Sequence, residues 1–373
     1  MDLKPPQDPF GRNVYCIGGL PIDCIDMAGA SARIRAAMRT RERLFLSTPN
    51  LNFLANSLSN PAFRASVLQS DLVVADGAPL VMLGRLLGAP LPERVAGSDL
   101  IERVAADLQA ENALAKVFLF GGRSGVGARA HEKLKDAATG LRSVGFLNPG
   151  FGDVATMSKP SIIETINASG ADFLLVALGA EKGQAWIMAN RHALTIPVLA
   201  HLGAVIDFWA GSIARAPKGL QRSGFEWAWR IAQEPALWRR YWRDFWKIAP
   251  QLATHFLPWR RDRLEGLKEL APVALALETV GAGARLYGRG AIGAAALGQW
   301  RDLARRALPI NGPLSIDLRE ISFVDLDIQA QILLLAAARA DRQATTQLAN
   351  VSPALRRQLT HSGFWAAMHA AAL

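Results

Sequence analysis

Asp71-Leu72-Val73-Val74-Ala75-Asp76-Gly77 is the stretch of sequence that most clearly indicates the fold. It joins a short apolar run to an abrupt stop at an acidic residue and a glycine, which is typical of a buried strand. Similar runs recur as far as Gly203, with segments of helical periodicity between them. Apolar strands that alternate with helices predict an α/β fold with a mostly parallel, Rossmann-like sheet covered on both faces. We expect its strands at residues 14–19, 43–47, 71–75, 116–120, 172–179 and 197–203.

Polar residues and glycines directly follow several of these strands. Ligands of parallel sheets bind beyond the carboxyl ends of the strands, where such residues meet. We therefore expect a ligand site built from Thr48, Asn50, Asp76, Gly121, Gly122, Gly179 and Gly203.

Composition excludes several classes of protein. The chain has 373 residues, 50% hydrophobic and 20% charged, which excludes a disordered chain and suggests about two domains. Cys16 and Cys24, the only cysteines, exclude a disulfide-rich scaffold and fit a reducing compartment. No apolar segment reaches the roughly 20 residues of a membrane span, and residues 1–13 lack the apolar core of a signal peptide. A cytoplasmic location is expected.

The net charge of +10 is concentrated in one segment. Residues 212–263 hold 11 Lys and Arg against 4 Asp and Glu, and 6 of the 10 tryptophans. Trp238, Trp242 and Trp246 are spaced to share one face of a helix, beside Arg239, Arg240, Arg243 and Lys247. This pattern favours a helix at an anionic membrane surface. The alternative is that the tryptophans pack on the core while the arginines face water. Nucleic acid is not expected as a partner, because no known binding motif accompanies the charge.

Asp76 is the leading candidate for a general base. A carboxylate just past a buried strand can take a proton from an attacking hydroxyl. Alternatively, Asp76 bonds its own backbone in an Asp-Gly turn. Thr48-Pro49-Asn50 likewise offers a hydroxyl and an amide at a strand end, or forms an ordinary turn. Spacing alone favours the turn in both cases.

Two further segments can hold phosphate. Arg94 precedes a glycine turn and can bind a diphosphate through two hydrogen bonds, although a surface arginine is equally consistent. Ser98 or Asp99 is most simply a helix cap. The loop from Gly121 to Gly127 can present amides to a phosphate, but its spacing departs from G-x-G-x-x-G and predicts no dinucleotide site. No metal-binding motif is present, so neither metal nor cofactor is expected.

Residues from about Val14 to Arg240 resemble the bacterial WecG/TagA/CpsF glycosyltransferases. One shared motif would be weak, but an ordered series makes the resemblance specific. The motifs are Thr48-Pro49-Asn50, Ala75-Asp76-Gly77, residues 93–100, Phe120-Gly121-Gly122, residues 203–211, Arg215-Ala216-Pro217, residues 224–230, Glu234-Pro235 and Arg239-Arg240.

This resemblance implies inverting transfer of a sugar, of the N-acetylmannosamine type or another hexose, from a UDP-sugar to a polyprenyl-diphosphate-linked saccharide. Such reactions build bacterial surface polysaccharide or exopolysaccharide. The resemblance makes Asp76 the general base and Thr48 a second catalytic residue, without metal. It also implies a peripheral position on the inner face of the cytoplasmic membrane. The implied substrate-binding residues are Asn50, Arg94, Gly121, Gly122, Gln184, Gly203, Asp207, Arg230, Arg239 and Arg240.

One motif departs from the family pattern. The family usually has Gly-x-Pro-Lys-Gln-Glu-x-Trp, whereas this chain has Gly179-Ala180-Glu181-Lys182-Gly183-Gln184-Ala185-Trp186. Gln184 is expected to replace the family glutamine through a shift of one residue. The departure also keeps open a second function, a non-catalytic protein that senses a nucleotide sugar and acts through its C-terminal domain.

The C-terminal residues 273–373 resemble a STAS domain through the stretch from Leu314 to Asp325. That family continues with a serine that is phosphorylated, whereas Leu326-Asp327-Ile328 stands here, so a phosphorylation switch is not expected. Asp327 is hypothesised to place a permanent charge there, and the domain to bind a partner protein or a ligand. We thus expect a core at 1–211, a membrane-proximal appendage at 212–263, a linker over 263–272 and a STAS-like domain at 273–373.

Overall fold

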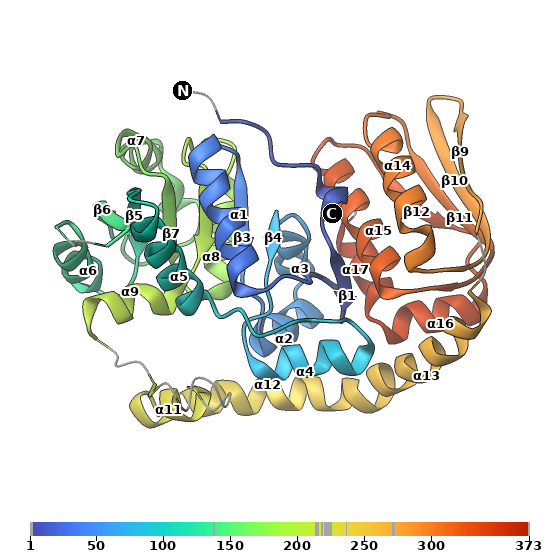
Figure 1. Ribbon diagram of the computed structural model, residues 1–373, viewed down its shortest axis with the longest axis horizontal. Helices are drawn as coiled ribbons and strands as arrows, with labels where there is room; N and C mark the ends of the chain where they lie inside the picture. Colours follow the sequence, from blue (N-terminus) through green and yellow to red (C-terminus); the bar gives the residue numbers. More distant parts are fainter. Residues whose placement is uncertain are drawn as a thin grey trace.

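The main sheet has six strands, all parallel, in the order β4-β3-β8-β7-β5-β6. The computed structural model describes residues 3–136, 139–212, 216–217, 219, 226–235, 237–270 and 273–371 (Figure 1). The sheet confirms the predicted α/β class. Its strands are β3 (Leu44–Ser47), β4 (Leu72–Val73), β5 (Ala115–Gly121), β6 (Leu141–Leu147), β7 (Phe173–Ala177) and β8 (Val198–His201).

Side chains of the sheet alternate between two separate cores, because successive residues of a strand point to opposite faces. Val117 and Leu119 join one core, and Phe118 and Phe120 join the other. The first core is covered by α1 (Met27–Thr40), α5 (Gly97–Ala110), α6 (Val126–Leu134) and α9 (Gly203–Ala210). The second is covered by η2 (Thr156–Ser158), α7 (Pro160–Ala168) and α8 (Ala180–Asn190), where Trp186 stacks on Phe120.

Residues 14–19 do not form a strand of the main sheet, contrary to expectation. They form β1 (Val14–Ile17) and the turn of an antiparallel hairpin with β2 (Leu20–Asp23), which is a separate sheet. Gly18 and Gly19 make the two-residue turn with φ of 59° and 84°, values that glycine adopts without strain. The hairpin is preceded by η1 (Pro9–Gly11).

Helices continue the chain beyond the main sheet. α2 (Leu51–Ser59), α3 (Pro61–Leu68) and α4 (Ala78–Leu87) follow the first strands. Later, α11 (Glu226–Gln233), α12 (Leu237–Gln251), η3 (Leu252–Phe256), α13 (Leu257–Gly266) and η4 (Leu267–Glu269) run along the lower edge of the molecule in Figure 1. The linker expected at 263–272 is thus helical as far as Glu269.

The C-terminal unit is a smaller α/β structure, as expected. Its sheet has the order β12-β11-β10-β9, in which only β9 and β10 are antiparallel. The strands are β9 (Leu275–Val280), β10 (Gly283–Ile292), β11 (Leu314–Val324) and β12 (Thr346–Ala349). The helices are η5 (Ala294–Ala296), α14 (Leu297–Ala307), α15 (Leu326–Ala340), α16 (Pro353–His361) and α17 (Phe364–Ala371).

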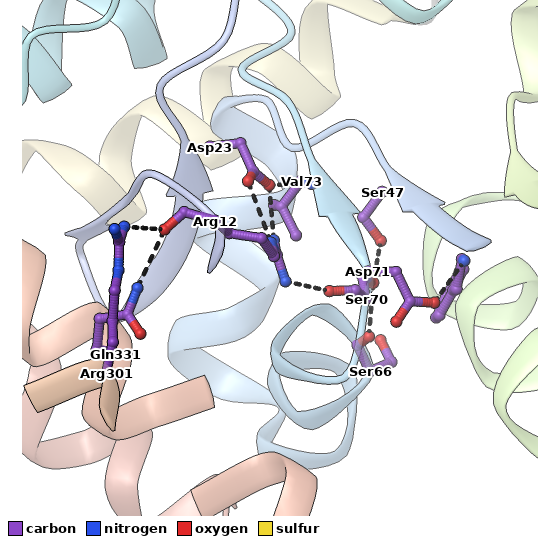
Figure 2. Close-up of polar contacts among 10 residues, drawn as sticks. Arg12, Asp23, Ser47, Ser66, Ser70, Asp71, Val73, Arg301 and Gln331 are labelled. Atoms are coloured by element: carbon purple, nitrogen blue, oxygen red, sulfur yellow. Dashed lines mark hydrogen bonds and ion pairs between the residues drawn. The ribbon is translucent and has the colours of Figure 1, made fainter. Parts of the chain in front are cut away.

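The C-terminal unit is not an independent appendage, because it shares one hydrophobic core with the hairpin and with α2 to α4. Helix α15 packs on β1 and β2 and is buried along nearly its whole length. Figure 2 shows a polar junction at the same place. The Arg12 guanidinium pairs with Asp23 at 2.6 Å and donates to the Ser70 carbonyl oxygen at 2.9 Å. The Arg12 carbonyl oxygen accepts hydrogen bonds from Arg301 and Gln331 of the C-terminal unit.

Asp327 lies inside this junction and not on the surface. Its side chain is 3% exposed, and burial together with the neighbouring charge of Asp325 raises the pKa of Asp327 to about 6. Asp325 pairs with Arg263 through two hydrogen bonds, of 2.7 and 3.0 Å. The Asp327 carboxylate is therefore not exposed to a partner protein, and the hypothesis that it carries a charge at this position stays a prediction.

Candidate active site

A cavity of about 1010 Å³ opens at the carboxyl edge of the main sheet. Residues that follow β3, β4, β5, β7 and β8 form its floor, because parallel strands all end at this edge. Helix α12 contributes aromatic side chains to its rim. The cavity therefore lies where the sequence predicts a ligand site.

Most of the predicted site residues line this cavity. They are Thr48, Asn50, Asp76, Arg94, Gly122, Gly179, Gly203, Asp207 and Arg240. Gly121 and Arg239 do not line it: Gly121 is packed against the backbone of Ala177, and Arg239 is exposed. The side chain of Arg230 and the motif residue Arg215 lie outside the described residues.

Asp76 reaches the cavity from the loop between β4 and α4. Its backbone N–H donates to the Pro49 carbonyl oxygen at 2.7 Å, which fixes this loop to the loop after β3. Its Oδ2 accepts a hydrogen bond of 3.4 Å from the N–H of Gly97, the first residue of α5. The carboxylate is thus held across two loops and remains partly exposed. Gly77 completes the turn with φ of 111°.

Thr48 and Asn50 flank Asp76 from the end of β3. Asn50 caps α2, because its Oδ1 accepts hydrogen bonds from the N–H groups of Asn52 and Phe53. Thr48 is 6% exposed and packs beside Gly97, where an added Cβ would lie 3.5 Å from the Thr48 hydroxyl. The cap shows that one predicted site residue also has a structural role.

Four Arg or Lys side chains line the cavity, and two of them pair with carboxylates. Arg94 pairs with Asp99 at 2.7 Å. Arg123 pairs with Asp207 at 2.9 Å, and this carboxylate raises the pKa of Arg123. Lys182 donates to the Gly152 carbonyl oxygen at 2.8 Å. Asp207 therefore orients Arg123, and anionic groups of a ligand would meet positive charge on several sides.

Gln184 does not occupy the position that the sequence predicts. It is fully buried in α8, and its amide donates to the Ser47 hydroxyl at 2.8 Å. Residues two apart on a helix point to nearly opposite sides, so Lys182 faces the cavity when Gln184 does not. Lys182 and Arg123 were missed as site residues, although both belong to motifs that the sequence analysis singled out.

His201 ends β8 and lines the same cavity. Burial lowers its pKa to about 4, so the ring is neutral at physiological pH. In the described part of the chain, no group of three or more His, Cys, Asp or Glu side chains is placed to hold a metal ion.

Helix α12 presents its aromatic face to solvent beside the cavity. Trp238, Trp242 and Trp246 are 50%, 56% and 55% exposed, on one face as predicted, so they do not pack on the core. Asp244 and Ile248, on the opposite face, are buried, and Asp244 accepts a hydrogen bond of 2.8 Å from Asn52 of α2. Trp238 and Trp242 also line the cavity. Among the described residues, no helix is long and apolar enough to span a bilayer.

These features define an α/β protein with a cavity at the carboxyl edge of a parallel sheet, lined in part by cationic side chains. Residues 15–262 match the glycosyl transferase WecG/TagA/CpsF family, and the chain belongs to this family of glycosyltransferases. It is similar to the N-acetylglucosaminyldiphosphoundecaprenol N-acetyl-beta-D-mannosaminyltransferase of Bacillus spizizenii (strain ATCC 23059 / NRRL B-14472 / W23). The two are 30% identical over 196 residues, which cover 52% of this chain and 74% of the relative. The match to the family ends at residue 262, before the C-terminal unit.

Proposed function

We propose that the chain transfers a sugar, of the N-acetylmannosamine type or another hexose, from a UDP-sugar to a polyprenyl-diphosphate-linked saccharide, with inversion. The observation that carries this proposal is the partly exposed carboxylate of Asp76 in a cavity that also holds Arg94, Arg123 and Lys182. The name of the bacillal relative supports a lipid-diphosphate acceptor. The product would belong to bacterial surface polysaccharide or exopolysaccharide.

The reaction needs one base and one place for negative charge. The Asp76 carboxylate takes the proton of the acceptor hydroxyl, whose oxygen forms a bond to the anomeric carbon of the sugar. The bond from that carbon to the phosphate oxygen breaks, and UDP leaves with the electron pair. Arg94, Arg123 and Lys182 stabilise the charge that develops on the diphosphate, and Thr48 and Asn50 position the sugar.

Helix α12 is proposed to be the part of the protein that contacts the membrane. Its exposed tryptophans lie next to arginines, the combination that favours the interface of an anionic bilayer. Because Trp238 and Trp242 also border the cavity, a lipid-linked acceptor reaches Asp76 without leaving the membrane. We propose peripheral binding to the inner face of the cytoplasmic membrane.

The C-terminal unit is proposed to be STAS-like, on the resemblance of residues 314–325. Its helix α15 is covered by the hairpin of the same chain, so the unit's first partner is its own catalytic core. A partner protein would have to use another face, such as the edge strand β9, where Val280 is 56% exposed.

The test of the catalytic proposal is the release of UDP from a UDP-sugar by the full-length protein. We expect release only when a polyprenyl-diphosphate-linked sugar is supplied. Asp76→Asn should lower kcat by about 100-fold or more, because the amide cannot accept the proton. Asp302→Asn, an exposed carboxylate of α14 outside the cavity, is the matched control. Wild-type turnover by Asp76→Asn would refute the role of Asp76 as base.

A further inference from the structure

The space beside Gly183 is occupied by the ring of His201. A Cβ placed on Gly183 would lie 2.9 Å from His201 Cγ and 3.3 Å from Nε2, and closer still to Cδ2. Carbon atoms at such separations overlap, so no larger residue fits position 183 while His201 keeps its place. Position 183 is the one at which the family motif has glutamine, and Gly183 is part of the departure from that motif. A side chain from β8 therefore fills the space that a side chain from α8 would otherwise take.

His201 also carries an unused hydrogen-bonding atom. Nε2 is buried, and among the described residues it has no hydrogen-bond partner. Its surroundings include the Phe53 ring, 6.4 Å away between centroids, and Gly203, the first residue of α9. Buried polar atoms are nearly always paired, so this nitrogen is available to hydrogen-bond a molecule bound in the cavity. The ring lines the cavity that holds Asp76.

We propose that His201 is a substrate-binding residue of this chain, whose imidazole hydrogen-bonds a hydroxyl group of the transferred sugar in place of a side chain at position 183. The inference rests on the proposed sugar transfer and names the residue that orients the donor. A neutral imidazole offers one donor and one acceptor nitrogen, which suits a hydroxyl group. In the ranges that the structure describes, no cluster of three or more His, Cys, Asp or Glu side chains includes this ring.

Exchanging the side chains of residues 183 and 201 tests whether His201 occupies the space that a side chain at position 183 would take. His201→Gly should leave the space empty and impair donor binding. Gly183→Gln alone should be worse, because the new side chain collides with the ring. Gly183→Gln combined with His201→Gly should recover much of the loss, because the glutamine amide then occupies the vacated space and offers the same hydrogen bonds.

The measurement is steady-state transfer by the full-length protein, with donor KM and kcat determined separately, and calorimetric binding of UDP-N-acetylmannosamine and UDP-N-acetylglucosamine. For His201→Ala we expect kcat/KM for the donor to fall about tenfold, mainly through KM, in a variant that stays folded. His192→Ala, an exposed histidine outside the cavity, is the matched control and should behave as wild type.

The outcomes separate the two proposals. If wild type binds the donor but transfers nothing, the proposed function fails, and donor affinity still decides the role of His201. If donor affinity and kinetics of His201→Ala equal those of wild type, or no donor binds, the inference is overturned. Should His201→Ala unfold, the double exchange decides: a folded double variant that does not recover donor binding overturns the inference.

Discussion

Helices α12 and α13 belong to one basic, tryptophan-rich segment, but the tryptophans differ in exposure between the two helices. In α12, three tryptophans are about half exposed, whereas Trp259 of α13 is 0% exposed. The Trp259 ring stacks on Phe323 of the C-terminal unit at 5.7 Å, and its indole N–H donates to the Leu87 carbonyl oxygen. The C-terminal unit covers α13 and leaves α12 uncovered. The same composition thus makes a structural junction in one helix and an open aromatic face in the next.

Trp259→Ala should produce the largest effect on stability. It removes a fully buried ring between the core and the C-terminal unit, which costs about 3–5 kcal/mol in free energy of unfolding. Chemical denaturation measures this loss. Liposome binding of the fraction that stays folded should be unchanged. A loss of liposome binding without a loss of stability would show that Trp259 takes part in membrane binding.

Asp327→Asn tests how a buried charge affects stability at the junction between the core and the C-terminal unit. The folded-state pKa of Asp327, about 6, lies above the unfolded value of 3.8, so the folded protein holds this proton more tightly. The stabilisation that the bound proton gives the folded state is complete below pH 3.8 and is lost as the pH rises through 6. At pH 7 the buried charge costs about 2–3 kcal/mol, by the linkage of pKa to stability.

The amide variant should therefore be more stable than wild type at pH 7, with the advantage shrinking towards pH 4. Thermal unfolding at several pH values measures this difference. Asp302→Asn, an exposed carboxylate, serves as the control. An Asp327→Asn variant that is less stable at pH 7 would show that the carboxylate is needed in its charged form.

The double variant Trp242→Ala/Trp246→Ala tests whether the exposed face of α12 binds the membrane. Both rings are exposed, so the free energy of unfolding should change by less than about 1 kcal/mol. Flotation with anionic liposomes should fall about tenfold, since the variant loses apolar area that would enter the interface. Leu264→Ala, which removes an exposed apolar side chain of α13, is the control. Undiminished flotation would place the membrane contact elsewhere.

Salt should produce the smallest change. Attraction between the arginines of α12 and anionic lipid is screened within about 8–10 Å at physiological salt. Raising the salt concentration should weaken flotation of wild type several-fold without abolishing it, because the tryptophans still insert. Complete release by salt would assign the binding to charge alone.

Several features of the fold and the site follow from local patterns. Five of the six strands of the main sheet were predicted, because each of these apolar runs carries its own signal, and the strand ends led to the cavity. Strand β6 was missed, because Arg142, Ser143 and Gly145 interrupt its apolar run. The hairpin at residues 14–23 was missed, because Gly18-Gly19 reads equally well as the end of a strand or as a turn. The assignment of Gln184 failed because a shift of one residue on α8 turns a side chain by about 100°.

The sequence by itself determined the α/β class, the edge of the sheet that holds the cavity, and the shared face of Trp238, Trp242 and Trp246, since these depend on periodicities of two or 3.6 residues. Tertiary structure alone decided that α12 stays uncovered while Trp259 is buried, and that His201 fills the space beside Gly183. Such outcomes depend on contacts between residues that can be hundreds of positions apart in the sequence. The local spacing of apolar residues does not predict these contacts.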